Sequence, residues 1–268
     1  MDKCIGVFDS GLGGLTNVKE LHKILKGENI VYFGDTGRVP YGTRSDDIIL
    51  KYTLQDLRFL TSFPVKAIIV ACGTVSSVAL PKIKDRIDVP IIGVVEPACQ
   101  KAVKITNNKK IGIIGTEGTI KSGAYKKKLL MEDETLKIYE NACPLFVPLV
   151  ENGYLESEAT KIIVKDYLLP LKEKGIDTLI LGCTHYPLLT KVISEFMGDE
   201  VCLVSPGVET ASYAKELLEN KGLLNKSDTL GKTEYYVSDN VEKFSYLASM
   251  FLDDKVFENV KKINIEDW

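Results

Sequence analysis

Short apolar runs alternate with amphipathic segments along most of the chain. The runs at 4–10, 29–35, 66–73 and 89–97 are rich in valine and isoleucine, and they read as continuously apolar stretches. Continuous runs of this kind are typical of strands that are covered on both faces, whereas alternation marks strands with one solvated face. The pattern therefore predicts a parallel sheet with crossover helices.

The segments between these runs carry helical spacing. Helices are predicted over 15–25, 45–62 and 74–86. Ser45 stands where an N-cap is expected, and the acidic residues that follow it suit the first turn of a helix. The first half of the chain thus alternates strand and helix.

The pattern begins again near residue 109. The segment KKIGIIGTEGTI at 109–120 resembles CIGVFDSGLGGL at 4–15, and Ile111-Gly112 follow Ile5-Gly6 by 106 residues. A repeat with the size of a domain indicates duplication of a whole folding unit, not a solenoid.

Two cysteine turns strengthen this interpretation. DTLILGCTHYP at 177–187 matches KAIIVACGTVS at 66–76, and Cys183 follows Cys72 by 111 residues. Any two α/β domains share a generic likeness, but that likeness does not explain a cysteine closely followed by a threonine at the same strand end in both halves. We expect an α/β fold of two similar domains, each a mostly parallel sheet flanked by helices, pseudo-symmetric about an interdomain cleft.

The predicted first domain covers 1–95 and returns at about 211–268, and the second covers 96–210. The returning segment holds a helical stretch at 213–221, a strand candidate at 233–239 and a helix at 240–252. We expect this segment to pack back on the first domain.

Composition narrows the classes of function. The chain has 268 residues, a net charge of −3 and 45% hydrophobic residues, and its lysine run at 126–128 is short enough to be a solvated helix face. Nucleic-acid binding and membrane binding gain little support, because there is no basic stripe and no apolar run near 18 residues. The six cysteines show no CxxC spacing and no secretion signal precedes them, so we expect a cytoplasmic protein without a disulfide framework or zinc site.

Polar residues gather where the predicted strands end. In open parallel sheets, ligands bind outside the carboxyl ends of the strands. The candidates at such ends are Asp9-Ser10, Asp35, Cys72-Gly73-Thr74, Thr116, Cys183-Thr184-His185 and Ser205. Two domains facing each other would bring Cys72 and Cys183 to one ligand from opposite sides.

Opposed thiols suit one kind of chemistry. A single cysteine near a carbonyl suggests acyl transfer. Two cysteines on opposite faces of a tetrahedral carbon suggest removal of a proton from one face and delivery to the other, which inverts the stereocentre. Asp9 would manage the proton of Cys72, and His185 that of Cys183.

Other motifs are less specific. The segment DSGLGGLT at 9–16 joins a strand to a helix, but Thr16 stands where GxGxxG needs its third glycine, so a tight turn is favoured over a dinucleotide site. RVPYG at 38–42 reads as a proline-containing turn that would offer the Tyr41 hydroxyl and the Gly42 amide to a carboxylate. No lysine stands in a context typical of pyridoxal phosphate.

Taken together, the motifs IGVFDSGLGGLT, YFGDTGRVPYG, VACGT, PLVENG and LGCTHYPLL resemble, in order and spacing, the glutamate racemases of the aspartate/glutamate racemase superfamily. The resemblance runs from about residue 4 to 210. It implies cofactor-independent interconversion of L- and D-glutamate by two cysteines in an interdomain cleft, and a supply of D-glutamate for bacterial peptidoglycan. It also implies a homodimer, and some members of the family are regulated by a cell-wall precursor.

The resemblance also implies roles for individual residues. Cys72 and Cys183 would be the acid/base pair, with Asp9 assisting the first, and Glu151 and His185 the second. No metal and no cofactor is implied. Substrate contacts would come from the turns around both cysteines and from the loops beside them: Asp9, Ser10, Tyr41, Gly42, Gly73, Thr74, Thr116, Thr119, Thr184 and His185.

Gly73 departs from the family pattern, which usually has asparagine there. The missing amide removes a substrate contact, typically worth about 0.5–1.5 kcal/mol as a net hydrogen bond. Racemisation of aspartate or another small acidic compound is therefore one alternative, although Tyr41-Gly42 favours glutamate. A non-catalytic binding protein of the same fold is a second alternative, and a nucleotide-binding α/β protein is a third.

Overall fold

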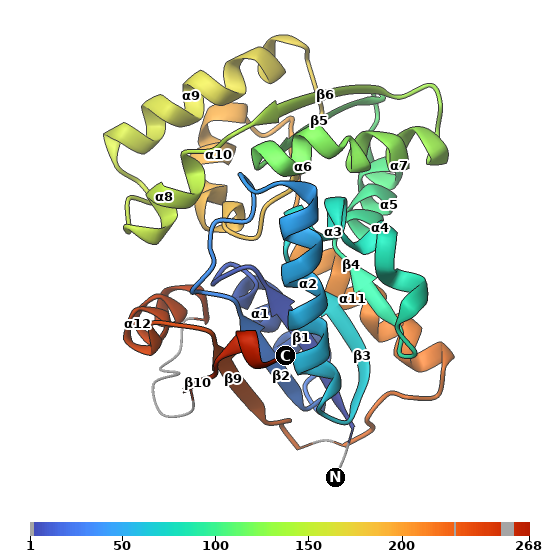
Figure 1. Cartoon of the computed structure of the whole chain (residues 1–268). Coiled ribbons are helices and arrows are strands. Elements are labelled where there is room, and N and C mark those ends of the chain that lie inside the picture. Colours follow the sequence, from blue (N-terminus) through green and yellow to red (C-terminus); the bar gives the residue numbers. More distant parts are fainter. Residues whose placement is uncertain (1–2, 228, 253–259) are drawn as a thin grey trace.

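The strands form two separate parallel sheets, one in each of two stacked domains (Figure 1). The computed structural model describes residues 3–227, 229–252 and 260–268. Within them the first sheet has the order β10-β9-β2-β1-β3-β4, and every pairing is parallel. Its strands are β1 (Cys4–Asp9), β2 (Ile30–Gly34), β3 (Val65–Val70), β4 (Ile91–Gly93), β9 (Thr233–Val237) and β10 (Val260–Lys262).

The second sheet repeats the inner part of the first. Its order is β6-β5-β7-β8, again all parallel. This is the order β2-β1-β3-β4 with each strand replaced by its counterpart in the repeat, so the topology confirms the predicted α/β fold of two similar domains. The strands are β5 (Lys110–Gly115), β6 (Lys137–Ala142), β7 (Thr178–Leu181) and β8 (Cys202–Val204).

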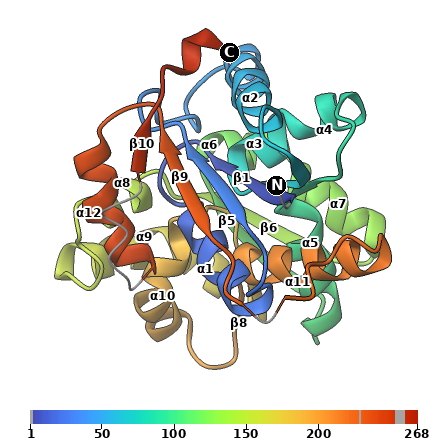
Figure 2. The ribbon, with the colours of Figure 1, turned by 90° about the horizontal axis from the view of Figure 1, so that it is seen from below.

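Helices cover both faces of the sheets. Figure 2 shows β9 beside β2, with the C-terminal end of the chain near α2. The α-helices are α1 (Leu15–Ile24), α2 (Asp46–Thr61), α3 (Gly73–Val78), α4 (Leu80–Ile83), α5 (Val95–Ile105), α6 (Glu117–Ser122), α7 (Ala124–Glu132), α8 (Phe146–Glu151), α9 (Glu158–Glu173), α10 (Thr190–Met197), α11 (Pro206–Asn220) and α12 (Val241–Leu252). Short 3₁₀ helices are η1 (Lys84–Arg86), η2 (Tyr186–Leu189) and η3 (Ile265–Asp267).

The structure corrects several predicted boundaries. The helix predicted over 74–86 is broken into α3, α4 and η1, because Pro81 at the start of α4 cannot donate a backbone hydrogen bond. The strand predicted over 89–97 is only the three residues of β4, since α5 already begins at Val95. The helix predicted from 213 begins at Pro206. The edge strand β10 was not predicted, because three residues show no period.

The inner strands are wholly buried, as their continuous apolar sequence predicts. All six residues of β1 and all six of β3 are inaccessible to solvent or nearly so. Each large apolar side chain buried in this way contributes about 1.5–3 kcal/mol relative to an exposed position. One apolar cluster continues from the first sheet into the second, and includes Ile69, Leu181 and Leu218.

Two helices join the domains. α11 packs on α1 of the first domain and on α5, which leads into the second. The predicted boundary at 95/96 falls at the start of α5, and the boundary at 210/211 falls inside α11. These boundaries stay a prediction, while the return of the chain end to the first sheet is visible in β9 and β10. Among the described residues, none of the helices has the length and apolar character needed to cross a bilayer.

Candidate active site

A cavity of about 440 Å³ lies between the two domains. It is lined by residues that follow β1, β2 and β3 on one side, and β5, β6 and β7 on the other. This is the position at which parallel sheets bind ligands, since the chain leaves β1 and β3 (and likewise β5 and β7) in opposite directions. The candidate residues in its wall are Ser10, Tyr41, Gly42, Cys72, Gly73, Thr74, Thr116, Glu151, Cys183, Thr184 and His185.

The two cysteines occupy equivalent positions. Cys72 is the second residue after β3, and Cys183 is the second residue after β7. Both line the cavity, and their exposed fractions are 5% and 8%. The structure thus brings two thiols from opposite domains to one space, as the repeat predicts.

Cys72 lies in an apolar and anionic environment. Its Sγ is 3.3 Å from Ser10 Oγ, within reach of a hydrogen bond. Burial, together with the nearby Asp9 carboxylate, raises the pKa of the Cys72 thiol to about 12. At neutral pH this cysteine is therefore a protonated thiol.

Asp9 lies behind Cys72, at the last position of β1, and does not line the cavity itself. It is 1% exposed, and its Oδ2 accepts a hydrogen bond of 3.0 Å from the Gly11 amide. Burial raises the pKa of Asp9, although the positive charge of His185 opposes the effect. A buried carboxyl with a raised pKa is suited to exchanging a proton with its neighbours.

Cys183 belongs to a relay of polar groups. The Nδ1 of His185 is 3.9 Å from Cys183 Sγ, and its Nε2 is 3.2 Å from Glu151 Oε1. Lys243 of α12 extends the relay, with its Nζ 3.3 Å from Glu151 Oε2. Phe251 of the same helix packs edge-on against the His185 ring, with centroids 5.8 Å apart. No local signal in the sequence pointed to Lys243 or Phe251.

The relay favours a charged imidazole. Burial alone would lower the pKa of His185, but its contacts with Cys183 and Glu151 outweigh burial and raise that pKa to about 10. Burial opposes ionisation of Glu151, yet His185 and Lys243 together lower the pKa of this carboxyl. An imidazolium beside Cys183 is the kind of partner that stabilises a thiolate. The surroundings of the two cysteines are therefore electrostatically opposite.

Threonine side chains connect the domains across the cavity. Thr74 Oγ1 lies 2.9 Å from Thr116 Oγ1, and Thr116 in turn caps α6 by accepting a hydrogen bond from the Thr119 amide. Thr184 Oγ1 lies 3.5 Å from Asp9 Oδ1. Thr119 is buried behind Thr116 and does not line the cavity, so a direct substrate contact from Thr119 is not supported.

The loop that follows β2 reaches up to the second domain (Figure 1). The Gly118 amide donates a hydrogen bond of 2.9 Å to the Gly42 carbonyl. The Tyr41 hydroxyl points away from the cavity toward Asp35 and Asp56, so its predicted contact with a substrate carboxylate is not supported. The earlier candidates Asp35 and Ser205 also lie outside the wall of the cavity.

Gly73 marks a direct contact between the domains. A Cβ atom on this residue would lie 2.2 Å from the Gly182 carbonyl oxygen, which is a backbone atom and cannot move aside. Gly13 is similar, since its Cβ would lie 2.1 Å from Thr184 Oγ1. The space of a side chain at residue 73 is thus taken up by the opposite domain. Among the described residues, no group of three or more histidine, cysteine or acidic side chains is arranged to hold a metal ion.

The geometry defines a two-domain α/β protein with a pair of thiols in its interdomain cleft, and comparisons with known proteins assign its family. The Asp/Glu/Hydantoin racemase family matches residues 18–214. A glutamate racemase of Geobacter metallireducens is 43% identical over 98% of this chain and 97% of its own length. The chain belongs to the Asp/Glu/Hydantoin racemase family and is an isomerase.

Solved structures agree with this assignment. The glutamate racemase isoform RacE1 of Bacillus anthracis has a TM-score of 0.93 at 39% identity, covering 97% of both chains. A Francisella tularensis glutamate racemase in complex with D-glutamate also reaches 0.93, at 35% identity, covering 100% of this chain and 99% of its own. An aspartate racemase of Picrophilus torridus shares the fold alone, with a TM-score of 0.56 and 15% identity, covering 83% of this chain and 95% of its own.

Replacing Gly73 with alanine is expected to push the domains apart. The added Cβ would overlap the Gly182 carbonyl, and overpacking of this kind typically costs about 1–3 kcal/mol. We expect a lower unfolding midpoint and a larger radius of gyration in small-angle X-ray scattering. Gly207→Ala is the matched control, because its Cβ would meet Asn17 at an ordinary 3.6 Å. A Gly73→Ala protein with the stability and radius of the control would contradict the close contact.

Replacing Glu151 with glutamine is expected to lower the midpoint of the His185 titration by about one pH unit or more, because the anionic partner is lost. The pKa of His185, about 10, lies above its ordinary 6.5, so its contribution to stability is complete below about 6.5 and is lost as the pH rises through about 10. NMR of the imidazole would measure the midpoint. Glu158→Gln, on the exposed start of α9, is the control and should leave it unchanged.

Proposed function

We propose that this protein interconverts L- and D-glutamate without a cofactor, using Cys72 and Cys183 as two bases on opposite faces of the substrate. The observation that carries the proposal is the cavity itself, which both thiols line from opposite domains. The substrate identity is supported by relatives named glutamate racemase at 35–43% identity, one of which holds D-glutamate.

The resting protonation states suit a two-base reaction. Inversion needs one thiolate to take the α-proton and one thiol to deliver a proton to the opposite face. Cys72 is held as a thiol by burial and by Asp9. Cys183 faces the charged His185, the kind of partner that favours a thiolate when the substrate proton is to be taken. After each turnover the two roles are exchanged, and proton transfer through Asp9 and through His185 with Glu151 restores them.

The protein must stabilise the carbanion, because an amino-acid α-proton is a very weak acid and no imine spreads the charge. Preorganised donors near the α-carboxylate would act like an oxyanion hole. Thr74, Thr184 and the other residues of both cysteine turns line the cavity, and their hydroxyl groups and backbone amides would supply these donors. Contact between the domains excludes water and strengthens these donors.

Gly73 bears on the choice of substrate. In place of the family's asparagine, this position offers backbone only, and the Gly182 carbonyl occupies the adjacent space. Backbone groups of the Cys72 and Cys183 turns would then hold the amino-acid head group. The missing asparagine amide would contact the amino-acid head group, which glutamate and aspartate share. Its loss therefore does not distinguish the two acids, and racemisation of aspartate remains the second candidate.

We further propose that the protein acts in the cytoplasm as a homodimer and supplies D-glutamate for bacterial peptidoglycan. These assignments follow the resemblance to the family. Oligomeric state is measurable by light scattering, and the biosynthetic role by rescue of a D-glutamate auxotroph.

Incubation with L-glutamate in D₂O tests the reaction. The protein is first treated with a chelator and freed of pyridoxal phosphate. We expect loss of the circular dichroism signal together with deuterium at Cα, because each inversion delivers a solvent-derived proton. Activity with aspartate alone would assign the second candidate. No exchange with these or any other acidic amino acid, in folded and reduced protein, would favour the binding-protein alternative.

Replacing either cysteine with serine is expected to reduce turnover about 10²–10⁴-fold, the range for loss of a general acid or base. The loss in kcat/KM must be equal in both directions, because the enantiomers have equal free energies in solution. Cys202→Ser is the matched control, since Cys202 is exposed on β8. A Cys72→Ser or Cys183→Ser enzyme with the turnover of this control would end the two-base mechanism.

A further inference from the structure

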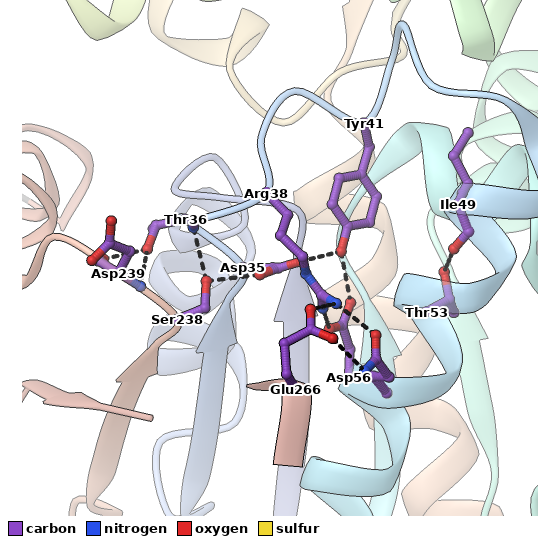
Figure 3. A network of polar contacts seen from close by, with 12 residues as sticks. Asp35, Thr36, Arg38, Tyr41, Ile49, Thr53, Asp56, Ser238, Asp239 and Glu266 are labelled. Carbon is purple, nitrogen blue, oxygen red and sulfur yellow. Dashed lines mark hydrogen bonds and ion pairs between the residues drawn. The ribbon is translucent and has the colours of Figure 1, made fainter. Parts of the chain in front are cut away.

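A buried polar network joins the loop after β2 to α2 (Figure 3). We call it the Arg38 network. Its inner members are Asp35 at the end of β2, Arg38 and Tyr41 in the following loop, and Asp56 of α2. Asp35 and Asp56 are both completely inaccessible to solvent. Ser238, Gln55 and Glu266 form its outer part.

Asp35 is surrounded by donors. Its Oδ1 accepts a hydrogen bond of 2.7 Å from Ser238 Oγ. Its Oδ2 accepts one of 2.6 Å from Arg38 Nε and a second from the Tyr41 hydroxyl. Three donors on one carboxyl group are what an ionised carboxylate satisfies, because an ionised carboxylate is an acceptor only.

Asp56 makes two polar contacts, but its neighbours supply a hydrogen for only one of them. Arg38 Nη2 donates to its Oδ1 over 2.9 Å. Its Oδ2 lies 3.1 Å from the Tyr41 oxygen, which has already given its single hydrogen to Asp35. The hydrogen in this second contact must then come from the Asp56 carboxyl itself.

We propose that Asp56 holds a proton at neutral pH and donates it to Tyr41, and that it thereby acts as a positioning residue for the Tyr41-Gly42 turn. The chain of donors runs from Asp56 through the Tyr41 hydroxyl to the Asp35 carboxylate. Every polar atom of the inner network is then satisfied.

The charges around Asp56 agree with this arrangement. Arg38 is the inner cation and it faces two buried carboxyl groups, so a proton on one of them leaves the interior neutral. The third carboxylate in contact with Arg38, Glu266, has a side chain that is 58% exposed and is solvated. Burial and the neighbouring Asp35 raise the pKa of Asp56 well above its usual range, although Arg38 and the contact with Tyr41 oppose them.

The network matters because of what it holds in place. Val39, Pro40, Tyr41 and Gly42 all line the cavity, and the Gly42 carbonyl receives the interdomain hydrogen bond from Gly118. Arg38 also stacks over the Tyr52 ring of α2, 4.1 Å from its centroid. A loosened network would displace this wall of the cavity. That part of the inference rests on the proposed function.

Two isosteric variants distinguish the roles of the Asp56 and Asp35 carboxyl groups. Asp56→Asn keeps a donor toward Tyr41 and an acceptor toward Arg38, so we expect KM for glutamate within about twofold of the native enzyme. Asp35→Asn removes the negative charge that faces Arg38 and turns the Ser238 contact around, since the amide N–H must then donate to Ser238 Oγ, so we expect KM to rise about tenfold or more, with a smaller change in kcat. Asp46→Asn, in an exposed pair with Lys82, is the control.

The pH dependence of stability tests the proton itself. The folded-state pKa of Asp56 lies above its unfolded value of 3.8, so wild-type stability falls as the pH rises from that value toward the folded-state pKa. The Asp56→Asn side chain does not ionise, so this variant lacks the fall in stability with rising pH. The unfolding midpoint of Asp56→Asn should therefore rise relative to wild type between about pH 5 and 8.

Carbon-13 NMR of the aspartate carboxyl groups in the wild-type protein measures the protonation state of Asp56 directly. This measurement depends neither on activity nor on whether the Asp35→Asn protein folds. The Asp56 signal, identified by its absence from Asp56→Asn, should keep the shift of a protonated acid through neutral pH. An ionised signal at pH 7, or equal rises in KM for both asparagine variants, would overturn the proposal. If the protein shows no racemisation, the proposed function fails, while the NMR result still decides whether Asp56 holds the proton.

Discussion

Close contact between the two domains at the level of the backbone is the constraint on which the rest of the site depends. Gly13 and Gly73 lie where any Cβ atom would overlap the opposite domain, and Gly118 donates a backbone hydrogen bond to Gly42 across the cleft. Gly13 meets the Thr184 side chain, but the contacts of Gly73 and Gly118 are with main-chain atoms, so these two define the separation of the domains more rigidly than side chains could. The separation of the domains in turn sets how closely two thiols approach one substrate.

The duplicated architecture places the cysteines symmetrically, and their surroundings then make them different. Burial and Asp9 hold Cys72 as a thiol, while Cys183 faces a histidine whose pKa is raised by its contacts with Cys183 itself and with Glu151. The helix α12 lies outside the repeated unit, yet it supplies Lys243 to this second relay. The two cysteines therefore have equivalent positions in the fold, but the charges around their thiol groups differ.

Several features of the fold and site were predictable because they depend on local pattern. Continuous apolar runs predicted buried parallel strands, and the matching runs around Cys72 and Cys183 predicted the repeated topology, which the two sheets confirm. Other features were not predictable. The Tyr41 hydroxyl is directed by the buried groups Asp35 and Asp56, and α3 ends early because of Pro81. Thr119 lies one layer behind the cavity wall, a distinction that sequence spacing does not contain.

The sequence by itself determined the fold class, the duplication and the two cysteine turns, since strand burial and turn chemistry are expressed in neighbouring residues. The tertiary structure alone decided which charges surround each thiol and how near the domains come. Lys243 reaches Glu151 from 92 positions along the chain, and Gly73 meets a carbonyl more than a hundred residues away. Such contacts arise from the packing of whole domains, and the electrostatics of a buried site follow from them.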